Sequence, residues 1–462
     1  MLAVMICPTW ILLSLTLRQP AQSGQDVTLS TPASGLELGQ FHTWLVELPP
    51  GSKPTSIAFD AEMPAHGHGL ADQPRIRPAG PRTFYVEGVR FHMTGTWNVR
   101  VRYQDSGGLL TVNFPLEVSY SSSQLRSLWL GSQARVRPDP SNRFADSSEA
   151  AALGKELFFD KRLSGDGSTS CATCHIPDVA FADTKRFSKL GLTRNTPGLL
   201  GVSESPWLLW DGRRDSLWSQ ALLPIESPEE MGGSRAAVAG LLRGSSYRER
   251  YSRLTGLAPE SLPVDRVFAD AGKWIAAYEQ TLQPRASRFD KYVEELQAGK
   301  LSKALSADEI AGLNVFLSPE ARCTQCHNGP LFTNQGFHNI GTGKFDGEHP
   351  DFGRAVGLMS LPYDAFNCRS AFSDNRESCA GLEFAKQDGH DGLLQGAFKV
   401  PSLRDVALTA PYMHDGSLAT LEAVVEHYRH TPKGGSELRP AVLADEQARQ
   451  LVAFLRALTG ER

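Results

Sequence analysis

Two short motifs of the same pattern constrain this chain more than any other feature. They are CATCH, which supplies Cys171, Cys174 and His175, and CTQCH, which supplies Cys323, Cys326 and His327. In each motif, two thiols one helical turn apart can form thioethers with the two vinyl groups of a haem, and the next residue offers an imidazole to the iron. One zinc site built from both CxxC pairs is the alternative, but it leaves the two histidines unexplained. The motifs therefore predict two covalently bound c-type haems, with His175 and His327 as proximal iron ligands.

Hydrophobic periodicity divides the chain into a β part and a helical part. Residues 24–120 contain five strand-like runs at the spacing of a β-sandwich, namely FHTWLVEL, SIAFDAEM, TFYVEGVRF, WNVRVRY and LLTVNFPLEV. Residues 121–146 are rich in Ser, Arg and Pro and predict a linker or an ordered crossover. A helical pattern then precedes each CxxCH motif, which predicts two copies of one unit, in residues 147–305 and 306–462. The predicted fold class is an immunoglobulin-like sandwich followed by two mainly α, cytochrome c-like haem domains.

Residues 1–23 are typical of an export signal. They contain the apolar run MLAVMICPTWILLSLTL, and AQS at 21–23 offers small residues for cleavage before Gly24. The start of this segment lacks Lys and Arg, so a retained membrane anchor is the alternative. We expect an exported, periplasmic protein. A net charge of −4 gives no electrostatic reason to expect nucleic acid or an anionic membrane as a partner.

The remaining cysteines predict one disulfide. Cys7 lies in the predicted signal and four cysteines lie in the CxxCH motifs, which leaves Cys368 and Cys379. An even remainder in an exported chain suggests that these two pair and close a short loop.

The side of each iron opposite the proximal histidine decides the chemistry. Between His175 and His327 there is no histidine, and Met231 is the only methionine, so the first haem has few candidates for a sixth ligand. An open iron position is where peroxide or oxygen can bind. The second half offers many candidates, which are His338, His390, Met359, Met413, His414, His427 and Tyr428. The sequence thus predicts one open haem and one six-coordinate haem.

Tyr428 lies in a predicted helix that begins after Thr420. Leu421, Val424, Val425 and Tyr428 recur at i, i+3, i+4 and i+7, so they share an apolar face. A buried phenol needs a partner for its oxygen. The helix pattern alone leaves open whether that partner is a backbone carbonyl or iron.

Residues 147–462 resemble the bacterial di-haem cytochrome c peroxidase and MauG family. The resemblance rests on LGKELFFDKRLSGDGSTSCATCHIPDVAFAD, RNTP, WLLWDGRRDSLWSQALLPIESPEEMG, CTQCHNGPLFTNQGFHNIG, FKVPSLRDVALTAPYMHDGS and the closing helix. It implies that Trp210 lies between the two haems and that Gln220 and Glu230 belong to the peroxide pocket. A carboxylate there can take a proton from peroxide and return it to the leaving oxygen.

The same resemblance implies one calcium ion, held by Asn195 and the carbonyls of Thr409 and Pro411. Oxygen ligands of this kind suit Ca²⁺. Peroxidases of the family usually carry a methionine fourteen residues after the histidine of the HDG-like motif, whereas MauG-type oxidases carry a tyrosine. Fourteen residues after His414 is Tyr428, which favours the MauG branch. The chain departs from MauG at Ala321, where MauG has a tryptophan used in long-range oxidation.

The stretches AEMPAHGHGL and GVRFHMTGTW are similar to YtkA-like β-sandwich domains. They bring thioethers and imidazoles into two loops, and this soft ligand set suits copper. The alternative is that the methionines pack the sandwich while the histidines line a polar loop. The candidate copper ligands are Met63, His66, His68, His92 and Met93.

The resemblance implies a di-haem oxidoreductase that uses hydrogen peroxide. The favoured reaction is MauG-like oxidation of an aromatic residue on a protein partner through high-valent haem iron. One alternative is a cytochrome c peroxidase that takes electrons from a small c-type cytochrome or a cupredoxin. Another, from a different class, is a non-enzymatic electron-transfer protein linked to copper handling.

Overall fold

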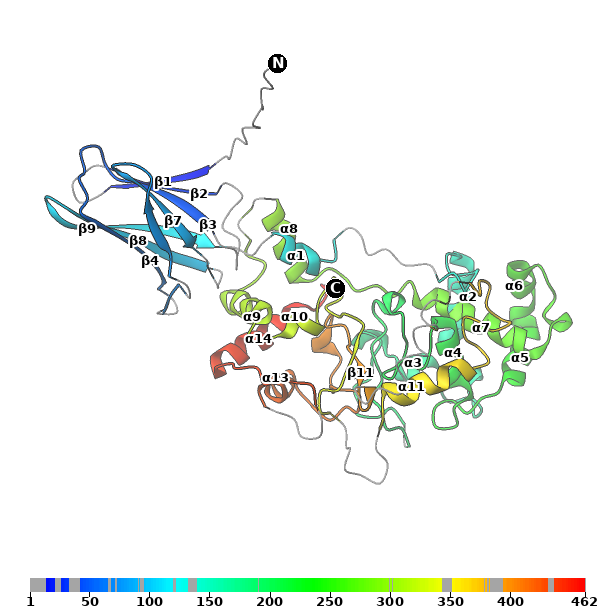
Figure 1. Ribbon diagram of the computed structural model, residues 1–462. Helices are drawn as coiled ribbons and strands as arrows, with labels where there is room; N and C mark the ends of the chain where they lie inside the picture. The colour runs from blue at the N-terminus through cyan, green and yellow to red at the C-terminus, as the bar shows by residue number, and fades with distance from the viewer. Residues whose placement is uncertain are drawn as a thin grey trace, which may run out of the picture. The chain divides into compact units, whose positions relative to one another are not determined.

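The chain forms two compact units in the computed structural model, Met1–Arg126 and Ser127–Arg462. Figure 1 shows that strands make up the first unit and that helices dominate the second. The residues that the structure describes are 14–20, 26–32, 42–64, 68–70, 73–89, 91, 95–118, 122–131, 139–189, 191–298, 300, 302–342, 351–377, 379, 382, 394–430 and 436–461. None of the helices in these ranges is long and apolar enough to cross a membrane.

The first unit is built from two antiparallel sheets. One has the order β1-β2-β3-β7-β6, with bounds Ser14–Pro20, Asp26–Pro32, His42–Glu47, Thr83–Val89 and Arg75–Pro78. The other has the order β5-β4-β8-β9, with bounds His68–Gly69, Ser56–Met63, Gly95–Asp105 and Gly108–Val118. Alternate residues of β3 are buried, as expected for a sheet with one face on the core.

The core of this unit contains the buried tryptophans Trp44 and Trp97, both in ring contact with Phe91. The five strands predicted from periodicity are all present, and the predicted fold class is confirmed. Periodicity missed β1, β2, β5 and β6, which are short or lie close to the N-terminus. β1 comes from the predicted export signal and pairs along its length with β2.

The second unit carries two helix sets in sequence. The helix α1 (Ser122–Leu128) spans the boundary between the units. The first set comprises α2 (Ser148–Phe159), α3 (Cys171–Cys174), α4 (Leu217–Glu226), α5 (Arg235–Arg243), α6 (Ser245–Thr255), α7 (Val264–Glu279) and α8 (Arg288–Gln297). The second comprises α9 (Ala307–Leu317), α10 (Cys323–Cys326), α11 (Arg354–Ser360), α13 (Leu421–Arg429) and α14 (Asp445–Ala457), with the strand pair β10 (Phe337–His338) and β11 (Phe398–Lys399). The helices expected before each CxxCH motif, around Tyr428 and at the C-terminal end are present as α2, α9, α13 and α14.

Local caps explain where these helices begin. The Ser147 hydroxyl accepts a hydrogen bond from the Ala150 amide at the start of α2, and Thr420 caps α13 in the same way. Ser306 and Glu309 form a reciprocal capping box at the start of α9. Such caps satisfy backbone amides that have no partner inside the helix.

The same helix crossing occurs in both halves of the second unit. α2 packs on α7 and α9 packs on α14, and each crossing has a glycine at the point of closest approach. A Cβ at Gly154 would overlap the Trp274 carbonyl oxygen, and one at Gly312 would overlap the Gln450 carbonyl oxygen. This repetition agrees with the predicted duplication of a helix–CxxCH unit.

A buried ion pair joins the two halves. Arg404 donates to Asp290 on α8 at 2.5 Å and to the Leu128 carbonyl oxygen at 2.8 Å. The Leu130 amide also donates to Asp290, at 3.1 Å. Leu128 and Leu130, which lie in the predicted linker, are therefore anchored in the helical unit.

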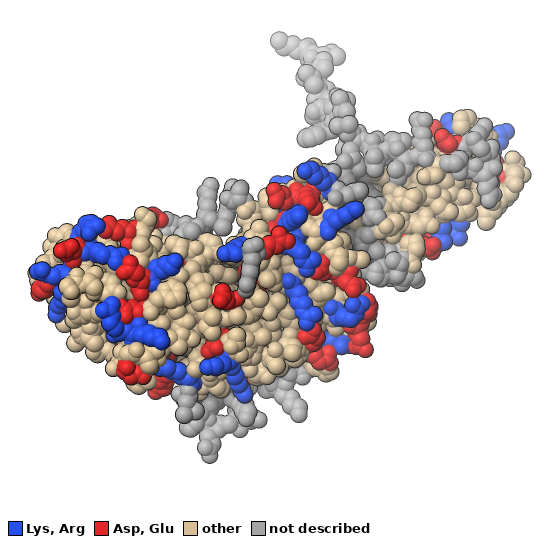
Figure 2. Space-filling model, turned by 180° about the vertical axis from the view of Figure 1, so that it is seen from behind, with Lys and Arg blue, Asp and Glu red and all other residues tan. Residues whose placement is uncertain are grey.

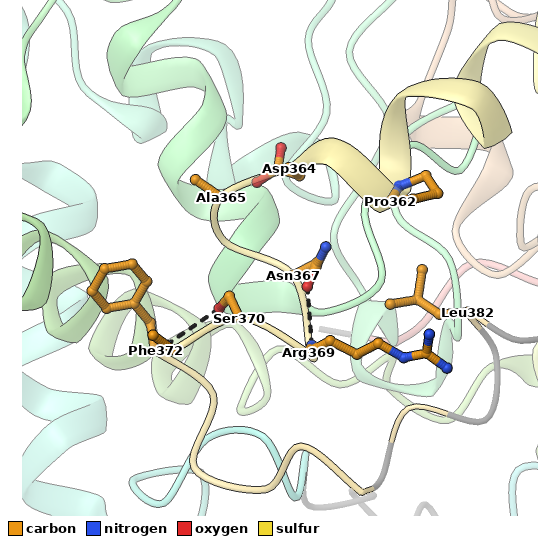
Figure 3. A pocket seen from close by; sticks show the side chains of 9 residues that line it. Pro362, Asp364, Ala365, Asn367, Arg369, Ser370, Phe372 and Leu382 are labelled. Carbon is orange, nitrogen blue, oxygen red and sulfur yellow. Dashed lines mark hydrogen bonds between the residues drawn. The ribbon is translucent and has the colours of Figure 1, made fainter.

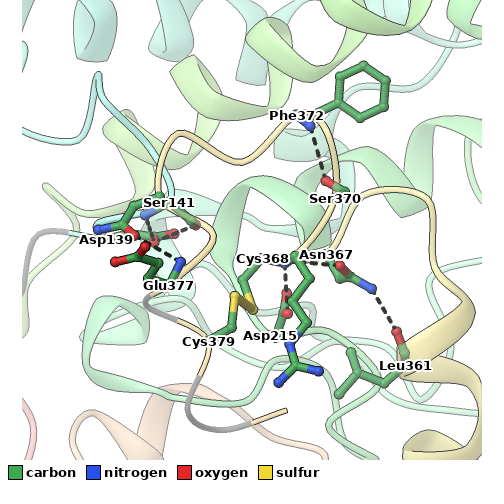
Figure 4. Close-up of a disulfide and its surroundings, with 12 residues drawn as sticks. Asp139, Ser141, Asp215, Leu361, Asn367, Cys368, Ser370, Phe372, Glu377 and Cys379 are labelled. Atoms are coloured by element: carbon green, nitrogen blue, oxygen red, sulfur yellow. Dashed lines mark hydrogen bonds between the residues drawn. A yellow bond between two sulfur atoms is a disulfide. The ribbon is translucent and has the colours of Figure 1, made fainter. Parts of the chain in front are cut away.

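Cys368 and Cys379 form a disulfide with a Cα–Cα distance of 5.7 Å (Figure 4), which is the pairing expected from the sequence. The Cys368 amide donates to Asp215 Oδ2 at 2.9 Å. The bridge therefore holds this loop beside the segment that follows Trp210.

Candidate functional site

The first CxxCH motif forms one helical turn, α3, that ends at His175. The His175 amide donates to the Cys171 carbonyl oxygen at 2.8 Å, which closes the turn. Nδ1 of His175 lies 2.8 Å from the carbonyl oxygen of Phe181, and Phe181 has a left-handed φ of 56°. A proton on Nδ1 completes this hydrogen bond and leaves Nε2 as the lone-pair nitrogen that iron requires.

The second motif repeats this geometry. The His327 amide donates to the Cys323 carbonyl oxygen at 2.8 Å, and Nδ1 lies 2.9 Å from the carbonyl oxygen of Phe332, whose φ is 53°. The φ and ψ angles are −99° and 80° at His175 and −100° and 77° at His327. Burial lowers the pKa of both imidazoles, that of His327 to about 4, so both stay neutral at physiological pH. The two motifs fit covalently attached haem.

A cavity of about 700 Å³ opens in front of His175, a volume in the range of cofactor sites. It collects the residues that the sequence assigned to the peroxide pocket and to calcium, which are Trp210, Gln220, Glu230, Asn195, Thr409 and Pro411. Met231 is absent from the described lining and packs in the hydrophobic core instead. Among the described residues, no histidine or methionine of the first half therefore competes for the open side of this site.

Glu230 follows α4, the helix that carries Gln220. Burial raises the pKa of Glu230, so its carboxyl group can exchange a proton nearer to neutral pH than an exposed glutamate does. The Lys189 ammonium donates to the backbone carbonyl oxygen of Glu230 rather than to its carboxylate. The carboxyl group of Glu230 is therefore available to a molecule bound in the cavity.

Trp210 is held from both halves of the unit. Its indole N–H donates to the Asn195 carbonyl oxygen at 2.8 Å, and its own carbonyl oxygen accepts from the Lys399 amide at 2.8 Å. The Asn195 amide donates to the His414 carbonyl oxygen at 2.7 Å. Asn195 thus links Trp210 to the segment that precedes α13.

Asn195 also bears on the predicted calcium site. Its side-chain amide nitrogen donates to the carbonyl oxygens of Lys185, at 2.9 Å, and Arg186, at 3.2 Å. This leaves the side-chain oxygen as the atom that could bind a cation, together with the carbonyl oxygens of Thr409 and Pro411. The described residues contain no cluster of three or more His, Cys, Asp or Glu side chains suited to a metal. Calcium binding therefore stays a prediction.

Most sixth-ligand candidates of the second half are engaged elsewhere. Met359 is 65% exposed, His427 Nε2 lies 2.7 Å from the Ile340 carbonyl oxygen, and His338 Nδ1 pairs with Glu437 at 3.1 Å. The His414 ring stacks on Phe398 at 3.4 Å. Met413 lines the cavity of the first motif, and His390 lies outside the described residues.

Tyr428 remains. Its side chain is partly buried on α13, and burial raises its pKa, with a further contribution from the Cys323 and Cys326 thiols. The phenol therefore lies near the second CxxCH motif. Among the described residues, no group hydrogen-bonds its hydroxyl, unlike the hydroxyl of Tyr412, which donates to the Val406 carbonyl oxygen at 3.1 Å.

Sequence reasoning missed a polar group on the wall of the large cavity. Lys399 Nζ donates to Ser205 Oγ at 3.1 Å, and Ser205 Oγ donates to Gln335 Oε1 at 2.9 Å. Burial lowers the pKa of Lys399 to about 8. These residues are far apart in sequence, so no motif could have connected them.

A second cavity, of about 420 Å³, lies in the disulfide loop (Figure 3). Its wall is held by local hydrogen bonds, from the Arg369 amide to Asn367 Oδ1 at 3.0 Å and from the Phe372 amide to Ser370 Oγ at 3.3 Å. Its described lining includes none of the predicted site residues.

The candidate copper ligands of the first unit lie mostly outside the described residues, namely His66, His92 and Met93. The backbone positions of Met63 and His68 are described, and they are paired directly across β4 and β5. The structure therefore places two of the five candidates in one hairpin.

A family model of di-haem cytochrome c peroxidases matches residues 148–298. The methylamine utilization protein MauG of Methylorubrum extorquens is 34% identical over 328 residues, which cover 68% of this chain and 79% of MauG. The cytochrome c551 peroxidase of Nitrosomonas europaea is 32% identical over 323 residues, which cover 69% of this chain and 82% of that protein.

Two solved structures are also similar. The MauG-like protein associated with microbial copper homeostasis is 28% identical, with a TM-score of 0.53 and coverage of 72% of this chain and 96% of that one. The diheme peroxidase BthA from Burkholderia thailandensis is 26% identical, with a TM-score of 0.55 and coverage of 70% and 87%. Together with the duplicated haem-attachment geometry, these similarities show that the chain belongs to the di-haem cytochrome c peroxidase and MauG family, whose members are peroxidase-type enzymes with two c-type haems.

Proposed function

We propose that this enzyme is a periplasmic, MauG-like oxidase. It uses hydrogen peroxide at the His175 site to oxidise an aromatic residue of a protein partner. The observation that carries this proposal is the position of Tyr428 near the second CxxCH motif, with a hydroxyl that no described group engages. The export signal expected in residues 1–23 supports the periplasmic location.

At the first site, bound haem would supply iron that reacts with peroxide. The role of the chain is to move protons. Glu230 takes a proton from the incoming peroxide and returns it to the departing oxygen, and its raised pKa suits both steps. Gln220 lines the same cavity and orients peroxide through its amide. The cavity in front of His175 has room for a small oxidant such as hydrogen peroxide.

At the second site, His327 and Tyr428 would hold the haem iron. A phenolate is a hard, anionic ligand and favours the higher oxidation states of iron, whereas a thioether favours the reduced state. Burial keeps the free phenol protonated, so the charge of the bound iron is what would stabilise the phenolate. Tyr428 would thus make the second site a store for oxidising equivalents.

Trp210 connects the two sites in this proposal. Its indole is oxidisable, and its hydrogen bond to the Asn195 carbonyl oxygen fixes the ring on the cavity wall. Asn195 and the carbonyl oxygens of Thr409 and Pro411 would together bind a calcium ion. That ion would stabilise the same cavity wall.

Rapid mixing of the oxidised holoprotein with one equivalent of hydrogen peroxide tests the proposal. We expect the first haem to react without prior reduction, and we expect reduced cytochrome c to sustain only slow turnover. A requirement for prior reduction, together with steady turnover on cytochrome c, would instead support the cytochrome c peroxidase alternative.

A copper-linked role is the second candidate. It is favoured by the Met63 and His68 pairing in one hairpin and by similarity to a protein whose structure is described as associated with microbial copper homeostasis. We expect the full chain to retain Cu(I) against a moderate chelator and to lose it when His66 and His68 are both replaced by alanine, since the remaining ligands cannot complete a site. Equal retention in both proteins would remove these histidines from the site.

A further inference from the structure

Helix α7 presents three polar or aromatic side chains at intervals of four residues, Asp270, Trp274 and Tyr278, so they share one face. The C-terminal end of α7 lies beside the first CxxCH motif. Burial, and after it the charge of Glu279, raises the pKa of the Cys171 thiol to about 12. The Tyr278 ring contacts Phe158 at 5.3 Å, and Phe158 lies 6.4 Å from the His175 ring.

The aromatic contacts continue away from the first motif. Trp274 contacts Tyr251 of α6 edge-to-face at 5.1 Å, and both side chains are completely buried. The Tyr251 hydroxyl donates to Asp270 Oδ2 at 2.6 Å. In the part of the chain that the structure describes, the Trp274 indole N–H has no hydrogen-bond partner.

Tyr247 lies four residues before Tyr251, on the same face of α6, and is also buried. The Tyr247 hydroxyl donates to Asp160 at 2.8 Å. Arg162, whose side chain is 58% exposed, also binds Asp160 and lies over the Tyr247 ring. Each of the two α6 tyrosines therefore has a carboxylate acceptor for its phenolic proton.

We propose that Trp274, Tyr251 and Tyr247 form an aromatic relay that carries oxidising equivalents from the His175 site toward the surface beside Arg162, with the Tyr278 ring along the way from the His175 site to Trp274. The relay rests on the proposed function, because it needs peroxide to react at the first site. Core packing explains why these rings are buried, and the Arg266 guanidinium, 3.3 Å from Asp270, balances the charge of the buried carboxylate. A neutral carbonyl would satisfy the Tyr251 hydroxyl as a hydrogen-bond acceptor, whereas the Asp270 carboxylate can also take its proton.

Electrons and protons are both accounted for at each transfer along the relay. Hydrogen peroxide is the two-electron oxidant of the first site, and each of its two oxidising equivalents is met by one electron that passes from Trp274 toward that site, past the Tyr278 ring, which keeps its proton and is not itself oxidised. Trp274 has no described proton acceptor, so it passes the oxidation on rather than trapping it. Tyr251 then gives an electron to Trp274 as its O–H bond breaks, and its proton moves to Asp270 Oδ2.

Tyr247 completes the path. It returns an electron to Tyr251, which recovers its proton from Asp270, while the Tyr247 proton moves to Asp160. A one-electron reductant of the phenol or ascorbate class, arriving at the surface beside Arg162, restores Tyr247. The relay would therefore discharge the first site when no partner is bound.

Electron paramagnetic resonance of the holoprotein, frozen after mixing with one equivalent of peroxide, tests the relay. We expect a tyrosyl radical that narrows when the protein is made with ring-deuterated tyrosine. Tyr251→Phe should lose most of this signal. Tyr292→Phe, a buried tyrosine of α8 outside the relay, is the matched control and should retain it.

Tyr247→Phe provides a second measurement that does not disturb the buried Tyr251–Asp270 pair. The radical should then persist on Tyr251 and decay more slowly with added ascorbate than in the parent. A parent whose optical spectrum responds to peroxide without any tyrosyl signal would overturn the relay and leave the proposed function standing. A parent with no optical response would overturn the proposed first site and the relay together.

Discussion

The two CxxCH sites have nearly the same backbone geometry around the proximal histidine. Each is one helical turn closed by an amide-to-carbonyl bond of 2.8 Å, and each histidine Nδ1 faces the carbonyl oxygen of a phenylalanine with a left-handed φ. Each is preceded by a helix that crosses a later helix at a glycine. The proximal geometry therefore does not distinguish the two sites.

The opposite side distinguishes them. His175 faces a cavity with Gln220 and Glu230 on its wall, whereas the second motif has the Tyr428 phenol beside it. In the proposed function, the duplicated attachment unit serves peroxide chemistry in one copy and charge storage in the other. The proposed division of labour rests on residues that lie 45 to 101 positions beyond the histidine of each motif.

Replacing Glu230 should have the largest effect and should be confined to the first site. Glu230→Gln removes the proton acceptor, so we expect the reaction with peroxide to slow by roughly a hundredfold or more. Stopped-flow absorbance measures this rate. Glu229→Gln, an exposed neighbour, is the control and should react at the parent rate. Equal rates in both variants would mean that Glu230 does not move this proton.

Exchanging Tyr428 for methionine should convert the second site without changing the first. Because a thioether stabilises reduced iron, we expect the potential of the second haem to rise by about 100 mV or more in Tyr428→Met. Spectroelectrochemical titration measures the shift. Tyr363→Met is the control, since Tyr363 is 89% exposed. An unchanged potential would assign the sixth position to another residue and would favour the peroxidase alternative.

The pH dependence of the peroxide reaction should also report on the first site alone. Burial raises the pKa of Glu230, and only its ionised form accepts a proton. The rate should therefore fall about tenfold per pH unit as the pH drops below that raised pKa. This acid limb should be missing in Glu230→Gln. An identical limb in parent and variant would assign it to a different group.

The smallest expected effect concerns stability at Glu279, which lies beside the first motif. Burial raises its pKa to about 8, and one carboxylate oxygen has no hydrogen-bond partner in the described structure. Between its ordinary pKa of about 4.3 and that value, the unfolded chain ionises Glu279 and the folded chain does not, so stability falls as the pH rises.

Glu279→Gln should remove this loss. We expect an apparent Tm at least about 2 °C higher than that of the parent at pH 8, with little difference at pH 5. Differential scanning calorimetry of the holoprotein measures both, and Glu249→Gln, at an exposed position of α6, is the control. A gain of equal size at both pH values would indicate a packing effect instead of ionisation.

Periodicity and motif spacing predicted much of this fold. The strands β3, β4, β7, β8 and β9 and the helices α2, α9, α13 and α14 follow from local patterns, because each buries one face. The helices α2, α9 and α13 also begin at side-chain caps. The strands β5 and β6 are too short to show alternation. β1 lies in an apolar run that resembles an export signal.

The site was predictable to a lesser degree. The CxxCH motifs identify their own chemistry, and Tyr428 stands out by its place on α13. The Asn195 to Trp210 hydrogen bond and the group of Lys399, Ser205 and Gln335 join distant segments, so no local pattern contains them. The left-handed φ of Phe181 and Phe332 was also hidden, because a phenylalanine gives no sign of it.

Those two phenylalanines affect how each site tolerates mutation over time. The acceptor that fixes each proximal imidazole is a main-chain carbonyl, so no side-chain replacement at Phe181 or Phe332 can delete it directly. The left-handed backbone costs roughly 1 kcal/mol at each position, and glycine or asparagine would relieve that strain. Amino-acid replacements at these two positions can therefore change the surrounding packing while the imidazole orientation stays the same. The orientation of each proximal histidine thus depends on backbone conformation. Many side-chain replacements around it should leave that orientation unchanged.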